Sequence, residues 1–232
     1  MDMRNIMAIF KKQLKDTLQN KTVLIQFIMF PLLALVMSRA ITIEGMPENF
    51  FVNLFATMYI GMAPLTSIAA IIAEEKEKNT LRVLMMSNVK PYEYLLGVGS
   101  YIWSACMLGA AVICAAGGFA LREGIAFMGI MAVGILASLV MGAAIGTWSK
   151  TQMMATSITV PVMMIFSFMP MLSMFNDTIA KIAKFIFSQQ VSIMLGQINV
   201  LRPEADNICI VVINIVIFTA LFSFSYKKCG LA

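Results

Sequence analysis

The chain has 232 residues, of which 60% are hydrophobic and 12% are charged, and its mean hydropathy is +0.86. A soluble domain carries about 25% charged residues, so this composition excludes a soluble globular protein and indicates a membrane protein. In such a chain the net charge of +5 is typical of basic loops on one membrane side. We therefore expect a surrounding lipid bilayer and no nucleic-acid partner.

Residues 2–21 carry apolar side chains at helical spacing. Ile6, Phe10 and Leu14 recur every four residues, and Lys11 with its basic neighbours lies on the other side. A helix with this pattern lies in the plane of the headgroups and turns its lysines towards anionic lipid. The alternative is a surface helix of a soluble domain, but an apolar run follows at once and favours the interfacial helix.

Six apolar runs with few or no charges follow, and each is long enough for the roughly 20 residues that cross a bilayer. They predict membrane spans at about residues 22–43, 50–73, 94–121, 124–148, 152–176 and 207–226. Serine and glutamine side chains make residues 177–206 too polar to face lipid, so we expect an exoplasmic or re-entrant segment of one or two short helices. The predicted fold class is an all-α polytopic membrane protein with a single transmembrane domain.

Basic residues orient the predicted bundle. Six spans place both termini on one side of the membrane, and twelve of the 17 lysines and arginines lie on that side. Because positive charge accumulates on the cytoplasmic side, we expect both termini in the cytoplasm, together with the charged segment at residues 74–90. The twelve are Arg4, Lys11, Lys12, Lys15, Lys21, Lys76, Lys78, Arg82, Lys90, Lys150, Lys227 and Lys228.

Several kinds of chemistry are missing from the sequence. The chain has no histidine, and no charged residue lies near the centre of a predicted span, whereas ion-coupled carriers use charged groups there. No Gly-Lys dipeptide occurs, so the phosphate-binding loop of an ATPase is absent. We expect no catalytic residue, no metal site and no cofactor bound by this chain. Any energy for uphill transport would therefore come from another polypeptide through a cytoplasmic contact.

Residues 74–90 form the one dense charge cluster between two apolar runs. Glu74 and Lys78 form an i, i+4 pair in the favourable order. The segment contains no proline before Pro91, so we expect one helix that continues from the second span. Such a helix can seat in a groove of a partner protein, or it can be a solvated helix that caps the span. The candidate contact residues are Glu74, Glu75, Lys76, Glu77, Lys78, Thr80, Leu81 and Leu84.

The order of residues in this segment is distinctive. After the acidic and basic run come Thr80, Leu81, Leu84, Val89 and then residues 92–97, which read Tyr-Glu-Tyr-Leu-Leu-Gly. This order resembles the signature of the ABC-2 type transporter permease family. Asn79, Asn88 and Val98 differ from that signature, which has glycine, proline and lysine at these positions.

The resemblance implies a function. It implies the transmembrane permease subunit of a bacterial ABC exporter, which moves an amphipathic or apolar substrate, such as a drug, a peptide or a lipid-like molecule, out through the plasma membrane. Its partners would be a cytoplasmic ABC ATPase subunit, which would bind ATP and Mg, and a second permease copy, identical or related. Residues 74–90 would be the coupling helix and residues 2–21 the connecting helix. The alternatives are an ATP-independent channel or ion-coupled carrier, and a non-transporting immunity or scaffold protein.

The first, second and fifth spans would line the substrate route in such a dimer. The candidate pathway residues on them are Met29, Phe30, Met58, Met62, Thr159, Met163, Phe166 and Met169.

The fourth span carries a stripe of small side chains that repeats every four residues. Small residues let another helix approach closely, so we expect a neighbouring span of the same subunit to pack there, with a subunit interface as the alternative. The stripe consists of Gly134, Ser138, Gly142 and Gly146.

Overall fold

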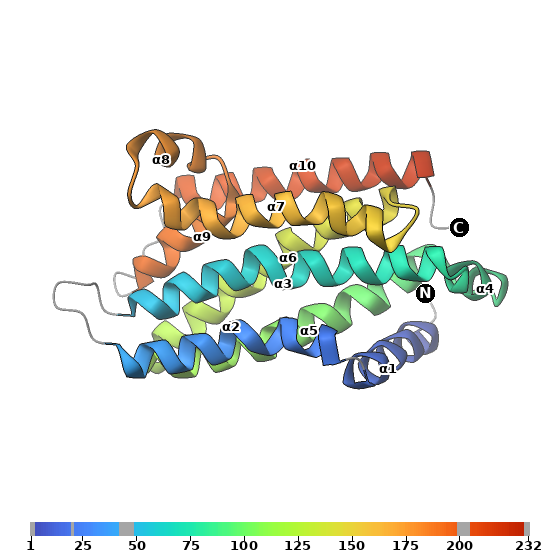
Figure 1. Cartoon of the computed structure of the whole chain (residues 1–232), viewed down its shortest axis with the longest axis horizontal. Helices are drawn as coiled ribbons and strands as arrows, with labels where there is room; N and C mark the ends of the chain where they lie inside the picture. The colour runs from blue at the N-terminus through green and yellow to red at the C-terminus, as the bar shows by residue number, and fades with distance from the viewer. Residues whose placement is uncertain (1–2, 20, 42–48, 199–204, 230–232) are drawn as a thin grey trace.

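The computed structural model describes residues 3–19, 21–41, 49–198 and 205–229, and these ranges are helical almost throughout, with no strand among them. Figure 1 shows an elongated bundle with α1 and α4 at one end, here called the α4 end, and with α8 and α9 towards the other, the α8 end. The helices are α1 (Met3–Gln19), α2 (Lys21–Ala40), α3 (Phe50–Glu77), α4 (Thr80–Met86), α5 (Pro91–Gly117), α6 (Leu121–Trp148), α7 (Gln152–Ser173), α8 (Asp177–Ala183), α9 (Phe187–Gly196) and α10 (Ala205–Cys229).

The bundle confirms the predicted class, an all-α polytopic membrane protein. Five described helices, α3, α5, α6, α7 and α10, are each long and apolar enough to cross a bilayer. The pair of α1 and α2 also meets this criterion when taken together, with a bend of 72° between Met3–Gln19 and Leu24–Ala40. Since α2 runs beside α3 and α5, the described part of the chain contains five spans, or six with α2 (Figure 1).

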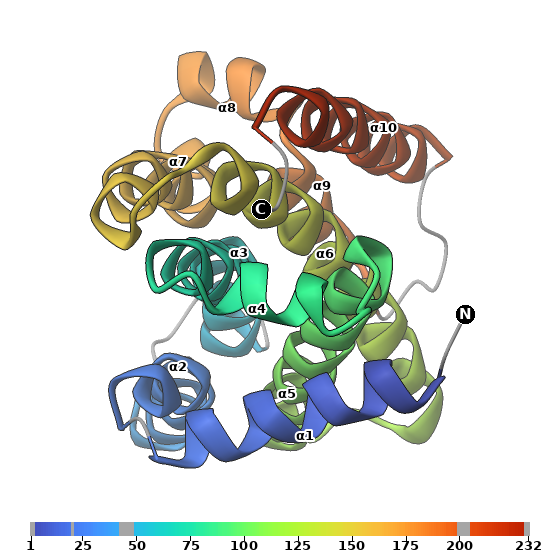
Figure 2. The same ribbon diagram turned by 90° about the vertical axis from the view of Figure 1, so that its right-hand side faces the viewer.

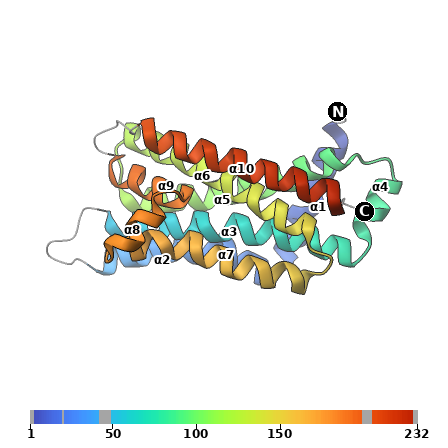
Figure 3. The same ribbon diagram turned by 90° about the horizontal axis from the view of Figure 1, so that it is seen from above.

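Helix α3 lies at the centre of the molecule. It packs against α2, α5, α6, α7 and α9. The apolar window of α3 is 72% buried, compared with 17% for that of α10, which lies at the outside of the bundle. Figure 3 shows the long helices running side by side, so every other span is placed by its contact with α3 or with a neighbour of α3.

The observed helix ends differ from the predicted ones by a few residues. Helix α5 begins at Pro91, three residues before the expected start at 94, because proline is well suited to the first turn and the Glu93 carboxylate accepts from the Lys90 backbone N–H at 3.2 Å. The helix ends at Gly117, and the next residue, Gly118, has a left-handed φ of +60°. The last residues of the expected first span, 42 and 43, lie outside the described residues.

The segment predicted at 177–206 contains two short helices, α8 and α9, and its residues 199–204 lie outside the described part. Helix α9 is inserted between α3, α6, α7 and α10, so its polar side chains face protein. The Gln189 side chain accepts from the Ser173 hydroxyl at 2.9 Å, and the Gln190 side chain donates to the Lys184 carbonyl. These bonds explain how a polar helix lies within an apolar bundle.

Candidate functional site

The charged segment at the α4 end is divided into two helices, so the expectation of one helix over 74–90 needs correction. Helix α3 ends at Glu77, and α4 starts at Thr80. Between them Asn79 has a left-handed backbone with φ +57°, and Asn88 after α4 has φ +66°. Asparagine tolerates this conformation better than most residues. Asn79 stands where the signature that this segment resembles has glycine, a residue that adopts the left-handed conformation readily.

The Glu75 carboxylate turns inward, towards α1. Its side chain is 9% exposed, and its Oε1 accepts from Lys12 Nζ at 2.5 Å and from Gln13 Nε2 at 2.7 Å. The buried Tyr94 hydroxyl lies beside the same carboxylate. A buried carboxylate with a charged partner and an amide donor is a structural tie rather than a free contact for another protein.

A second buried carboxylate, Glu93, also meets α1. It is 2% exposed, and its Oε2 accepts from Asn5 Nδ2 at 2.8 Å. One turn further along α5, the Gly97 backbone lies so close to Ile9 that an added Cβ would stand 2.8 Å from the Ile9 Cβ. Helix α1 therefore contacts the chain on both sides of α4, through Glu75 before it and Glu93 after it.

Four further charged side chains at the α4 end also have partners within the chain. Glu74 binds Lys78 in the exposed i, i+4 pair expected from the sequence, and this hydrogen bond raises the pKa of Lys78 above its ordinary value. The Glu77 carboxylate accepts from the Gln152 backbone N–H at 2.7 Å, at the start of α7. Lys76 donates to the Thr147 carbonyl of α6 at 2.6 Å.

Helix α4 is anchored on one side and open on the other. Leu81 is 1% exposed and packs into the core, and Leu84 is half-buried against the same core. On the outer side Val83 is 61% exposed and Met86 is 80% exposed. Thr80 is also exposed. The end view in Figure 2 shows α4 lying across the end of the bundle, with α1 running beneath it.

The candidate pathway residues fall into two groups. Phe30, Thr159 and Phe166 are buried: Phe30 meets the Tyr59 ring, the Thr159 hydroxyl donates to the Ala155 carbonyl, and Phe166 packs against aromatic rings of α9 and α10. The others are half-buried or exposed and include one residue of α2, Met29, which is 39% exposed. The remaining members of this group are Met58, Met62, Met163 and Met169.

One side of α3 is left half-exposed between α2 and α7. Its members recur every three or four residues, which places them in one stripe along the helix. They are Phe51, Phe55, Met58, Met62, Thr66 and Ala70.

The structure places the small-residue stripe of α6 against α3. An added Cβ at Gly134 would meet Ile60 at 3.0 Å, and one at Gly146 would meet the Ala69 carbonyl at 3.0 Å. Ser138 donates to the Ile60 carbonyl at 2.6 Å, and the α-carbon of Gly142 faces the Leu65 backbone.

The residues that join α1 to the α4 end were not predicted from the sequence. Glu93 and Gly97 were named as part of the signature but not as contacts of α1, and Asn5 and Gln13 were not named, although a glutamate at the start of an apolar run indicates a polar partner. Within the described ranges, no three His, Cys, Asp or Glu side chains come together as a metal site.

A sequence model of the family described as ABC-2 family transporter protein matches residues 4–224. The chain belongs to the ABC-2 family of transporter proteins. A search of curated proteins gives no match to the chain. ABC-2 family members are the membrane components of ABC transporters, which work with an ABC ATPase subunit, so this chain is a multi-pass membrane permease. Its α1, α4 and the adjoining ends of α3 and α5 form the candidate site of contact with that subunit.

Proposed function

We propose that this chain is the permease subunit of an ABC exporter and that a separate cytoplasmic ATPase subunit drives it through α4. Lysines and arginines accumulate at the α4 end, which favours a cytoplasmic location for this end of the bundle. The outer side of α4, with Val83 and Met86, offers a small apolar surface that suits a groove of the ATPase.

The observation that carries the proposal is the attachment of α1 to both sides of α4. Asn5 and Lys12 are seven residues apart and so lie on one face of α1, with Ile9 between them. Asn5 binds Glu93 after α4, and Lys12 binds Glu75 before it. A force on α4 therefore reaches α3 and α5 together, and α1 keeps these two helix ends at a constant distance.

The half-exposed stripe of α3 supports a substrate route at a dimer interface. In a dimer formed through α2, α3 and α7, the stripe would face the second permease copy, identical or related. Phe51, Phe55, Met58 and Met62 make the stripe apolar, and methionine adapts to varied apolar ligands. We therefore infer an amphipathic or apolar substrate that leaves the cell through this interface.

The test is the variant Met86→Asp in the purified complex with the ATPase subunit, reconstituted in proteoliposomes. A buried aspartate in the α4 contact is unfavourable, so we expect a loss of at least tenfold in permease-stimulated ATP hydrolysis. The matched control is Leu121→Asp, because Leu121 is 85% exposed and Met86 is 80% exposed, but Leu121 lies at the α8 end.

Equal loss of stimulation in both variants would mean a general effect on the membrane protein and would contradict the role of α4. Gradient-driven transport by the chain alone in liposomes would favour the channel or ion-coupled carrier instead.

A further inference from the structure

A basic cavity of about 870 Å³ lies at the α4 end, and none of its described lining residues belongs to α1. Cations from three parts of the chain line it: the α3–α4 segment, the turn after α6 and the end of α10. No carboxylate is among its described lining residues. These are Lys76, Asn79, Leu81, Arg82, Lys150, Lys228 and Cys229.

The neighbouring carboxylates are held elsewhere. Glu74 binds Lys78, and Glu75 binds Lys12 of α1. Glu77 turns to the other side of α3, where its carboxylate accepts from the backbone of α7. Four like charges around one cavity repel one another, so an anion that enters it is attracted by all four.

Aromatic rings fix one of these cations at the membrane boundary. The Lys228 Nζ lies 4.8 Å from the centre of the Trp148 ring and 5.9 Å from that of Phe224. The two rings are stacked with centroids 6.2 Å apart. Tryptophan is enriched at the level of lipid headgroups, so this stack places the cavity beside the headgroups of one leaflet.

An apolar groove of about 600 Å³ lies between α5, α6 and α10, with Ile68 of α3 at its base. Its rim is open to the outside of the bundle, because Leu96 is 48% exposed and Leu136 is 46% exposed. Its one lining hydroxyl, that of Ser100, already donates to the Gly97 carbonyl at 3.1 Å. This volume is typical of pockets that hold small ligands.

The groove and the cavity follow one another along three helices. Lining residues of the groove and of the cavity are separated by about two helical turns, roughly 10–12 Å, on α3, at the end of α6 and on α10. The three pairs are Ile68 with Lys76, Ala143 with Lys150, and Phe222 with Cys229.

We propose that the cavity and the groove together bind one anionic phospholipid, with its phosphate among the four cations and an acyl chain in the groove. Basic pockets between membrane helices bind such headgroups. The cavity is formed partly by Arg82 of α4 and partly by Lys228 of α10, so the bound lipid holds α4 against the bundle. The bound molecule is a lipid of the surrounding membrane, whatever substrate the transporter exports.

The experiment measures lipid binding to the purified full chain in detergent micelles by native mass spectrometry, with dioleoyl-phosphatidylglycerol and dioleoyl-phosphatidylcholine as probes. We expect one phosphatidylglycerol to bind more tightly than phosphatidylcholine. The double variant Lys150→Gln/Lys228→Gln should weaken phosphatidylglycerol binding about 30-fold, which is roughly fivefold for each lysine removed. The matched control is Lys181→Gln/Lys184→Gln, which removes two exposed lysines at the α8 end and should leave binding unchanged.

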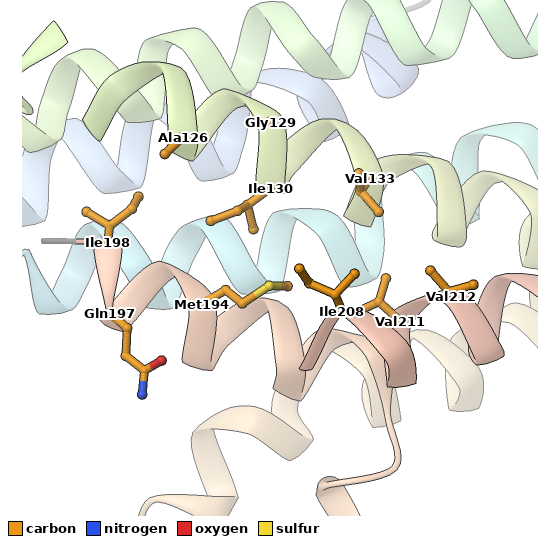
Figure 4. A pocket seen from close by; sticks show the side chains of 10 residues that line it. All are labelled: Ala126, Gly129, Ile130, Val133, Met194, Gln197, Ile198, Ile208, Val211 and Val212. Carbon is orange, nitrogen blue, oxygen red and sulfur yellow. The ribbon is translucent and has the colours of Figure 1, made fainter. Parts of the chain in front are cut away.

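A second pair of variants tests the groove. An added Cβ at Gly99 would meet nothing within 4 Å, so the side chain of Gly99→Leu extends into the groove and should weaken phosphatidylglycerol binding at least tenfold. Gly129 is equally open but lines a different pocket, at the α8 end between α6, α9 and α10 (Figure 4). Gly129→Leu should therefore have no effect.

Three outcomes would overturn the proposal. One is equal binding of the two lipids. Another is displacement of phosphatidylglycerol by glycerol phosphate at equal concentration, which would indicate a soluble phosphate ligand. The third is unchanged lipid binding in Lys150→Gln/Lys228→Gln combined with lost ATPase binding, which would assign the cavity to the protein partner.

Discussion

At Gly97 the backbones of α1 and α5 approach so closely that only a hydrogen fits between them. The ideal Cβ position there lies 2.8 Å from two atoms of the Ile9 side chain and 3.1 Å from the Ile6 carbonyl. Gly99, two residues further along α5, has open space around it. The two glycines share a helix and have opposite surroundings, so they separate the role of the α1 contact from the general effect of glycine in a helix.

We predict that Gly97→Ala loosens α1 and costs about 1–3 kcal/mol of stability, because Ile9 and the α1 backbone must move away. Gly99→Ala should be neutral or stabilising by up to about 1 kcal/mol, since alanine favours the helix. Thermal unfolding in detergent measures the cost, and hydrogen exchange of residues 3–19 measures the loosening. Equal exchange in the two variants would contradict the docking role of Gly97.

Helices α6 and α3 pack closely along the bundle. Small residues of α6 repeat every four positions, and the backbone of α3 fills the space above Gly142 and Gly146, while the Ile60 side chain of α3 fills the space above Gly134. In a membrane this close approach is the main source of helix association, because lipid is as apolar as the helices themselves. Ser138 adds a buried hydrogen bond to the Ile60 carbonyl.

We predict that Gly142→Ala destabilises the fold by about 1–3 kcal/mol, since its Cβ would overlap the Leu65 carbonyl and lie 2.5 Å from Ile68 Cγ2. Gly129→Ala is the control on the same helix, because nothing lies within 4 Å of the added atom. The melting temperature in detergent should fall for the first variant only. A fall of the same size for both would show that helix packing at the stripe is not the cause.

At the scale of the whole molecule, one face differs from the rest. Helices α2, α3 and α7 form one side of the bundle in the end view, and α10 lies away from them (Figure 2). The central helix, α3, shows its half-exposed stripe only on this side. A second permease copy seated on this face would cover the stripe and enclose the proposed route.

We predict that a cysteine at the α2 face cross-links two copies of the chain. Met29→Cys, in a background in which Cys106, Cys114, Cys209 and Cys229 are replaced by alanine, should give a disulfide-linked dimer in membranes after mild oxidation. Val216→Cys on α10 is the control, because Val216 is 62% exposed on a face away from the proposed interface. A dimer that forms equally well from Val216→Cys would contradict the proposed interface.

The sequence predicted the class of the protein and the approximate spans, because the thickness of a bilayer sets the length of each apolar run. Each predicted span overlaps an observed helix. The helix ends differ from the predicted ones where capping residues set them, as Pro91 and Gly118 do for α5. The two short helices before the last span were also expected, since serine and glutamine are too polar for lipid.

The sequence by itself determined that this is a polytopic all-α membrane protein and, through its signature residues, that it belongs to the ABC-2 family. Only the tertiary structure decided what the charges of the candidate site contact. Glu75 and Glu93 bind side chains that are 62 and 88 residues away along the chain. The sequence alone does not distinguish a carboxylate that the fold buries from one that stays in solvent. Partners so distant in sequence come together because α1 packs along α5 and reaches the end of α3, and no local pattern encodes this arrangement.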